Sequence, residues 1–194
     1  MRYDAEHKQR TRERVVREAS EALREHGPDQ IGVATLMARA GLTHGGFYAH
    51  FASKEALVAE AIASMFEDQR GAFERAMQDS PPAEGLSAYI DRYLSTRHRD
   101  HRGQGCPVAA LSGDLARMPE SMRESFDAGV HHMIDRLAGI LHQLAHEHPR
   151  EQAASAVAEM VGALTVARAI SDPKLSRSLL NATKDGLKKR LGLA

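Results

Sequence analysis

Polar side chains able to form hydrogen bonds gather in the short segment 44–54, which contains His44, Tyr48, His50 and Lys54. His44 and Tyr48 lie four residues apart and share one face of a helix. Lys54 follows Ser53, a good helix cap, so its ammonium lies at a helix N-terminus, where phosphate is favoured. These groups suit hydrogen bonding to base edges and phosphates, whereas no nucleophile–base pair or carboxylate pair stands out in the chain.

Two short helices must position these side chains. Residues 33–40 predict one helix, which ends at Gly41, and residues 43–50 predict a second. Two short helices joined by a Gly-containing turn are typical of a helix-turn-helix, whose second helix enters the DNA major groove. Gly45 and Gly46 give that helix a small first turn, which either permits close approach to base edges or merely loosens a turn. Spacing alone leaves both interpretations open.

Residues 40–57, AGLTHGGFYAHFASKEAL, closely resemble the recognition segment of the TetR family of transcriptional repressors. The shared pattern is Ala-Gly, a capping Thr, a Gly, aromatic residues, His-Phe and Ser-Lys-Glu-x-Leu. The resemblance implies a repressor, not an enzyme, that binds a palindromic double-stranded DNA operator as a homodimer. It implies release by a small molecule or by a reactive electrophile or oxidant. The residues expected at the DNA are Thr35, Thr43, His44, Gly45, Gly46, Tyr48, His50 and Lys54.

Composition favours an all-α protein. The chain has 194 residues, of which 42% are hydrophobic and only 5% aromatic, so a sizeable core is available. Lys+Arg and Asp+Glu both number 26, and residues 1–58 contain nine basic and eight acidic side chains, so any charge signal for DNA is local. No run reaches the length of a membrane span, the N-terminus has no apolar leader, and the single cysteine excludes an internal disulfide. We therefore expect a cytoplasmic protein without a cofactor.

Helical periodicity and Pro or Gly stops divide the chain into two domains. We expect an N-terminal three-helix helix-turn-helix domain over 1–60 and a helical effector-binding and dimerisation domain over 61–194, joined within one long helix. Residues 1–9 are expected to be mobile. The predicted helices cover residues 10–26, 33–40, 43–50, 54–79 and 84–97, then a charged loop at 98–105, a short helix from Pro107, about 28 residues from Pro119 closed by Pro149, and residues 151–171 and 174–190. Asp172 predicts the start of the last helix as a cap followed by Pro173 at the first helical position.

The last two helices are candidates for the dimer interface. Small residues on the first of them would let helices approach closely, although an ordinary intramolecular core fits the pattern equally well. The resemblance favours a dimer, since the family dimerises through a four-helix bundle of its last two long helices. The residues expected there are Val157, Val161, Leu164, Leu175, Leu179 and Thr183.

An effector pocket is expected in the C-terminal core, lined by Tyr89, Tyr93, Phe126 and Val130, although an ordinary core fits these residues equally well. Cys106 directly precedes Pro107 at a predicted helix start, and His98, Arg99, His101 and Arg102 lie just upstream. Helix N-termini and nearby cations lower the pKa of a thiol, so Cys106 is a candidate sensor of oxidants or electrophiles. The opposing interpretation is a small buried hydrophobe.

The alternative function is a small helical enzyme or metal-binding bundle. His142 and His146 have ligand spacing on a helix, but both lie about 150° or more from the apolar stripe of that helix, on its solvated face. We assign no catalytic or metal-binding residue. Salt-dependent retention on duplex DNA would favour the regulator, and turnover with bound metal would favour the alternative.

Overall fold

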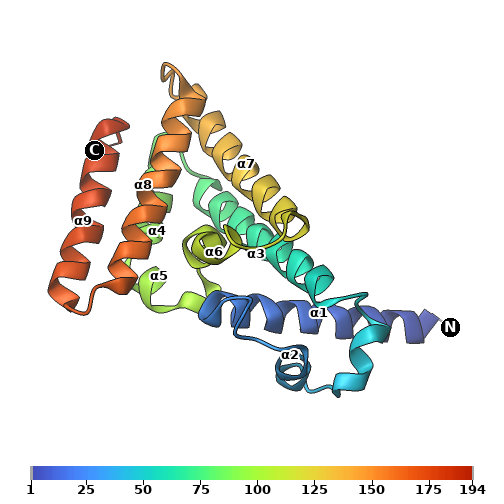
Figure 1. Cartoon of the computed structure of the whole chain (residues 1–194). Coiled ribbons are helices and arrows are strands. Elements are labelled where there is room, and N and C mark those ends of the chain that lie inside the picture. Colours follow the sequence, from blue (N-terminus) through green and yellow to red (C-terminus); the bar gives the residue numbers. More distant parts are fainter. Residues whose placement is uncertain (1, 194) are drawn as a thin grey trace.

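The computed structural model describes residues 2–193, and every regular element within that range is a helix (Figure 1). The all-α prediction is therefore confirmed. The α-helices are α1 (Arg2–His26), α2 (Val33–Arg39), α3 (Lys54–Met77), α4 (Pro82–Tyr93), α5 (Thr96–Asp100), α6 (Pro107–Leu115), α7 (Glu120–Gln143), α8 (Pro149–Ala169) and α9 (Pro173–Arg190). Two 3-10 helices, η1 (His44–Ala49) and η2 (Arg102–Gln104), complete the order. No helix in the described range is long and apolar enough to cross a membrane.

The N-terminal unit consists of α1, α2, η1 and the start of α3. Helix α2 ends as predicted, because Gly41 adopts a left-handed φ of +70°. Ser53 caps α3 by accepting a hydrogen bond from the Ala56 amide. The expected start of the first helix near residue 10 is wrong, because α1 already begins at Arg2. Residues 6–13 support this extension through side-chain pairs four apart, Arg10 with Glu6 and Gln9 with Glu13.

The predicted second helix of the helix-turn-helix is a 3-10 helix rather than an α-helix. Thr43 precedes it in an extended conformation, as an N-cap should, but its side chain makes no capping hydrogen bond. The Gly46 amide bonds the Thr43 carbonyl at 3.1 Å, a tight three-residue turn. The adjacent pair Gly45 and Gly46 disfavours an α-helical first turn, which explains the shorter repeat.

Helix α3 joins the N-terminal unit to the rest of the chain and runs beside α7 (Figure 1). Its inner face carries the buried residues Leu57, Ile62, Met65, Phe66 and Phe73. The approach of α7 depends on Gly129, where an added Cβ would lie only 2.1 Å from the Phe66 ring. Helices α3 and α7 therefore pack closely side by side.

The segment between α4 and α6 differs most from the prediction. The expected helix over 84–97 ends at Tyr93, and the expected loop over 98–105 instead forms α5 and η2. Ser95 caps α5 by accepting a hydrogen bond from the His98 amide. Helix α6 begins at Pro107 as predicted, with Cys106 at the N-cap.

Helices α8 and α9 pack together at the opposite end of the molecule from the N-terminus (Figure 1). Pro149, which we expected to close the preceding helix, instead occupies the first turn of α8, because α7 already ends at Gln143. Asp172 caps α9 by accepting from the Lys174 amide, and Pro173 follows it as predicted.

Candidate nucleic-acid interface and inner cavity

The side chains expected to read DNA form an exposed surface on α2 and η1. Tyr48 is 73% exposed, which is unusual for so large an aromatic residue. Thr35, Thr43, His44 and Gly45 are also exposed, whereas Gly46 is half-buried. An exposed tyrosine and imidazole beside a glycine-containing turn can approach another macromolecule closely and exchange hydrogen bonds with it.

A buried layer holds this surface in place. Phe47 and Phe51 are buried, and their rings stack with centroids 5.6 Å apart. The guanidinium of Arg12, on α1, lies over the Phe51 ring at 4.4 Å from its centroid. The same guanidinium pairs with Glu60 of α3 and donates to the His50 carbonyl. Arg12 therefore fixes the end of η1 against both neighbouring helices.

His50 and Lys54 are less exposed than His44 and Tyr48. His50 is half-buried, and its Nδ1 has no hydrogen-bond partner within the described chain. Burial, and secondarily the charges of Lys8 and Arg12, lower the pKa of His50, so the neutral imidazole is favoured. Lys54 Nζ donates to the Pro28 carbonyl at 2.9 Å, which ties the start of α3 to the loop after α1. One hydrogen bond leaves the charge of Lys54 unneutralised and its other donors available.

A cavity of about 350 Å³ lies between α3, α4 and the α5–η2 segment. Its wall combines two tyrosines with cationic and amide side chains and contains no acidic residue. The lining residues are Gln69, Tyr89, Arg92, Tyr93, Ser95, Arg97, His98, His101 and Gln104. Of the residues expected to line an effector pocket, the structure places Tyr89 and Tyr93 in this wall.

Phe126 and Val130 lie elsewhere, on α7. Phe126 packs edge-to-face on Phe66, with ring centroids 5.8 Å apart. Val130 is half-buried against the same core. The expectation that they share a pocket with the tyrosines is wrong, because the close packing of α7 on α3 leaves them on the core side of that contact.

His98 connects the cavity wall to the start of α6. Its Nδ1 lies 2.7 Å from the Tyr93 carbonyl, and its Nε2 accepts a hydrogen bond from the Cys106 amide at 2.9 Å. Only the neutral tautomer with hydrogen on Nδ1 satisfies both contacts. Burial lowers the pKa of His98 to about 4, and the nearby guanidinium of Arg168 acts in the same direction. The imidazole is therefore an uncharged linker near neutral pH.

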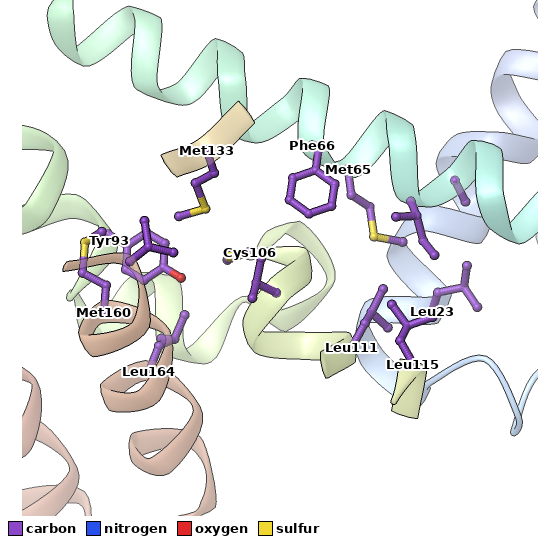
Figure 2. Close-up of a cluster of buried hydrophobic side chains, with 14 of the residues drawn as sticks. Leu23, Met65, Phe66, Tyr93, Cys106, Leu111, Leu115, Met133, Met160 and Leu164 are labelled. Atoms are coloured by element: carbon purple, nitrogen blue, oxygen red, sulfur yellow. The ribbon is translucent and has the colours of Figure 1, made fainter. Parts of the chain in front are cut away.

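Cys106 is a core residue and not a reachable thiol (Figure 2). Its side chain is 0% exposed and lies among buried side chains from several helices, including Tyr93 and Leu111. Burial raises the pKa of the thiol. The expectation of a low-pKa, accessible sensor is wrong, because the sulfur faces the core while the upstream arginines bond elsewhere, Arg99 to Asp100 and Ser176 and Arg102 to the Arg168 carbonyl. The Tyr93 hydroxyl, also buried, has no hydrogen-bond partner in the described chain.

Two arginines hold the α5–η2 segment from opposite sides. Arg24 of α1 is buried and donates to the Gly105 carbonyl at 2.9 Å, while pairing with Asp68 of α3 at 3.2 Å. Arg168 of α8 donates to the His98 carbonyl at 3.1 Å and to the Arg99 carbonyl at 3.2 Å. One short segment beside the cavity is therefore bonded both to the N-terminal unit and to α8.

The outer faces of α8 and α9 carry part of the expected dimer surface. Leu175 is 56% exposed, and Val161, Leu179 and Thr183 are half-buried. Val157 and Leu164 are buried within the single chain, so their assignment to an interface between chains is wrong. They belong to the inner stripe of α8, which packs against the chain's own core.

The described residues contain no group of three His, Cys, Asp or Glu side chains placed to hold a metal ion. His142 is exposed, and His146 bonds the Gln152 side chain at 3.1 Å. The solvated helix face that the sequence predicts is thus found for His142, whereas for His146 the prediction is wrong, because α7 ends at Gln143 and His146 is half-buried in the turn that follows.

Sequence reasoning missed several cavity residues, and one left a usable signal. Gln69 is buried at 8% exposure, at helical spacing from Ile62, Phe66 and Phe73 on the inner face of α3. A polar residue at a core position indicates either a buried partner or a cavity. The roles of Arg24 and Arg168 had no such signal, because their partners are backbone carbonyls distant in sequence.

Two family profiles match the chain. Residues 15–61 match the family described as bacterial regulatory proteins, tetR family. Residues 82–179, about half of the chain, match the C-terminal domain described as transcriptional regulator LmrA/YxaF-like.

Known proteins similar to the chain include the HTH-type transcriptional repressor DhaR of Mycobacterium sp. (strain GP1), which is 27% identical over 114 residues. The match spans 58% of this chain and 56% of DhaR, little more than half of that relative's length. Among solved structures, the reduced form of E. coli NemR has a TM-score of 0.81 at 22% identity, over 92% of this chain and 95% of that one. A TetR transcriptional regulator from Chloroflexus aurantiacus J-10-FL has a TM-score of 0.81 at 24% identity, over 97% and 96%. These two structures share the fold.

Proposed function

The chain belongs to the TetR family of bacterial transcriptional regulators, and we propose that it represses transcription by binding a palindromic operator as a homodimer until a small molecule releases it. As a family member, it is a DNA-binding regulator and not an enzyme. The observation that carries the proposal is the exposed surface of η1, which presents His44 and Tyr48 on a buried aromatic base. We place the boundary between the reading and sensing domains near residue 60, within α3.

In this proposal η1 enters the major groove. His44 contacts base edges, while Tyr48 and His50 contact the backbone, and the bare turn at Gly45 and Gly46 allows close approach. Lys54 uses its remaining donors on a phosphate at the N-terminus of α3. Thr35 and Thr43 flank this surface and add hydroxyl contacts to the backbone.

The exposed outer faces of α8 and α9 support dimerisation. Leu175, Leu179 and Thr183 follow one another at helical spacing on α9, beside Val161 on α8. A four-helix bundle formed by two copies would bury this apolar stripe and relate the two readers by a two-fold axis. Such symmetry matches an operator with two inverted half-sites.

Release follows from the position of the cavity. An occupant touches α4 and the α5–η2 segment. This segment is bonded to α8 through Arg168 at α5, and to α1 through Arg24 at Gly105, directly after η2. A ligand that prefers a shifted α5 would therefore move η1 relative to the dimer bundle. The distance between the two copies of η1 would then no longer match the spacing of the operator half-sites. Only differential affinity for the two conformations produces such a shift.

The test begins with selection of duplexes from a random DNA pool by the full-length chain. We expect enrichment of an inverted repeat with steep salt dependence. His44→Ala and Tyr48→Ala should each weaken binding to that repeat by about 1–3 kcal/mol. Gln143→Ala, exposed at the far end of α7, is the control. Both reader variants binding like the unmodified chain, with intact folding, would refute the assignment.

Lys54→Ala separates phosphate contacts from base contacts. It should weaken binding to all duplexes alike and reduce the salt slope by about one. Because Lys54 also bonds the Pro28 carbonyl, the thermal stability of the variant must be measured in parallel. A loss confined to the selected sequence would contradict the phosphate role.

A further inference from the structure

The cavity beside α5 has a strongly cationic wall. Arg92 and Arg97 are exposed at its edge, and His101 lies next to them. One N–H group of Arg92 donates a hydrogen bond to the Ala72 carbonyl at 3.2 Å. Within the part of the chain whose side chains are described, neither arginine takes part in an ion pair. The positive charge of these two arginines therefore lacks an acidic partner among the side chains that the structure describes.

Deeper in the cavity the wall changes character. Tyr89 and Tyr93 are buried, with ring centroids 6.0 Å apart, and offer aromatic surface. Gln69 is 8% exposed and faces the same space from α3, yet its amide forms no hydrogen bond with any described residue. A ligand that displaces water from this amide must replace its hydrogen bond, because a desolvated amide without a partner is unfavourable. The inner wall is thus suited to a flat apolar group that also carries a hydrogen-bonding atom.

We propose that the cavity binds a compact organic anion with one planar ring, a carboxylate and a further polar ring substituent. This inference rests on the proposed function, since it names the chemical class of the effector. The carboxylate pairs with both Arg92 and Arg97 at the edge, since guanidinium groups favour carboxylate partners. The ring packs on Tyr89 and Tyr93, and the substituent bonds Gln69.

The volume and the charge exclude other classes of ligand. The volume of about 350 Å³ equals that of roughly a dozen water molecules in the liquid, which accommodates one substituted ring but not a dinucleotide or a long lipid. An organic cation would face two unpaired guanidinium groups. A purely apolar molecule would leave the Gln69 amide desolvated without a partner.

The test is calorimetric titration of the full-length chain, without DNA, with 4-hydroxybenzoate, 4-hydroxyphenylacetate and the neutral amide of each acid. We expect at least one acid to bind with a dissociation constant below 1 mM, roughly 10-fold or more tighter than its amide. Arg97→Gln and Arg92→Gln should each weaken that acid about 10-fold, and Gln69→Leu should remove the advantage of the hydroxyl over the unsubstituted acid. Arg123→Gln, an exposed arginine on α7, is the matched control and should bind normally.

Two outcomes would overturn the inference. One is that no acid of the set binds below 1 mM to folded protein, and the other is that amides bind as tightly as acids. An equal loss in Arg123→Gln would assign the effect to net charge and also reject the site. Because the titration contains no DNA, its result is separate from the operator experiment, so failure of one proposal does not obscure the other.

Discussion

The linkage through His98 makes the stability of the protein depend on pH in a definite direction. The folded chain holds the imidazole neutral, because Nε2 accepts from the Cys106 amide while Nδ1 is bonded to the Tyr93 carbonyl. Protonation would replace the acceptor with a second donor facing that amide. We therefore expect acid to destabilise the wall of the cavity.

The magnitude follows from the pKa. Burial lowers the pKa of His98 from 6.5 to about 4, so the unfolded chain takes up this proton at a higher pH than the folded chain. The contribution of His98 to stability is complete above pH 6.5 and is lost steadily as the pH falls towards 4. The shift corresponds to about 3 kcal/mol of unfolding free energy over that range.

The assay is urea unfolding of the unmodified chain and of His98→Gln between pH 7 and pH 4.5, at one fixed chain concentration. Near pH 7 the variant should be less stable, because glutamine does not reproduce both hydrogen bonds. The difference in unfolding free energy between the unmodified chain and His98→Gln should narrow by about 2 kcal/mol as the pH falls, since only the unmodified chain loses the His98 contribution. His101→Gln, exposed on the same segment, should keep a constant difference from the unmodified chain. A constant gap for His98→Gln would refute the neutral-linker interpretation.

Three further predictions concern packing and assembly. Gly129→Ala should destabilise the fold by about 1–3 kcal/mol, because the added methyl group overlaps the Phe66 ring. Gly139→Ala, in open space on the same helix, should stabilise it by up to about 1 kcal/mol. Equal effects of the two substitutions on urea unfolding would contradict the packing of α7 on α3. Leu175→Glu should convert dimers to monomers in sedimentation and weaken operator binding, and a surviving dimer would place the interface elsewhere. The Cys106 thiol should react with a thiol-specific reagent on the order of 100-fold more slowly in the folded chain than in urea, and comparable rates would show that it is accessible.

Strong local signals allowed much of the fold to be predicted from the sequence. Asp172 followed by Pro173 predicted the start of α9, and Ser53 predicted the start of α3, because capping depends on residues adjacent in the chain. The α5–η2 segment could not be predicted in this way. Its carbonyls are held by Arg24 and Arg168, which come from distant helices, so the helical turns there depend on tertiary contacts.

The same limit explains the error at Cys106. Cations near a cysteine in sequence lower its pKa only if their charges lie near the sulfur in space. In the fold the cationic segment faces the cavity and the solvent, while the Cys106 side chain turns into the core. The sequence therefore predicted the cationic cluster correctly, but the expectation that this cluster lies close to the Cys106 sulfur was wrong.

Helix α8 shows why a periodic pattern alone cannot separate a core from an interface. Val157 and Leu164 form an inner stripe buried in the chain's own core, whereas Val166 lies on the opposite side of the helix and is 51% exposed. Apolar residues on both sides of one helix require two partners, and periodicity does not say which side packs within the chain. Arg168 extends from the same helix to the carbonyls of α5. Helix α8 therefore packs on the chain's own core and bonds the cavity wall, and in the proposed dimer its outer face would couple ligand binding to the geometry of the two copies.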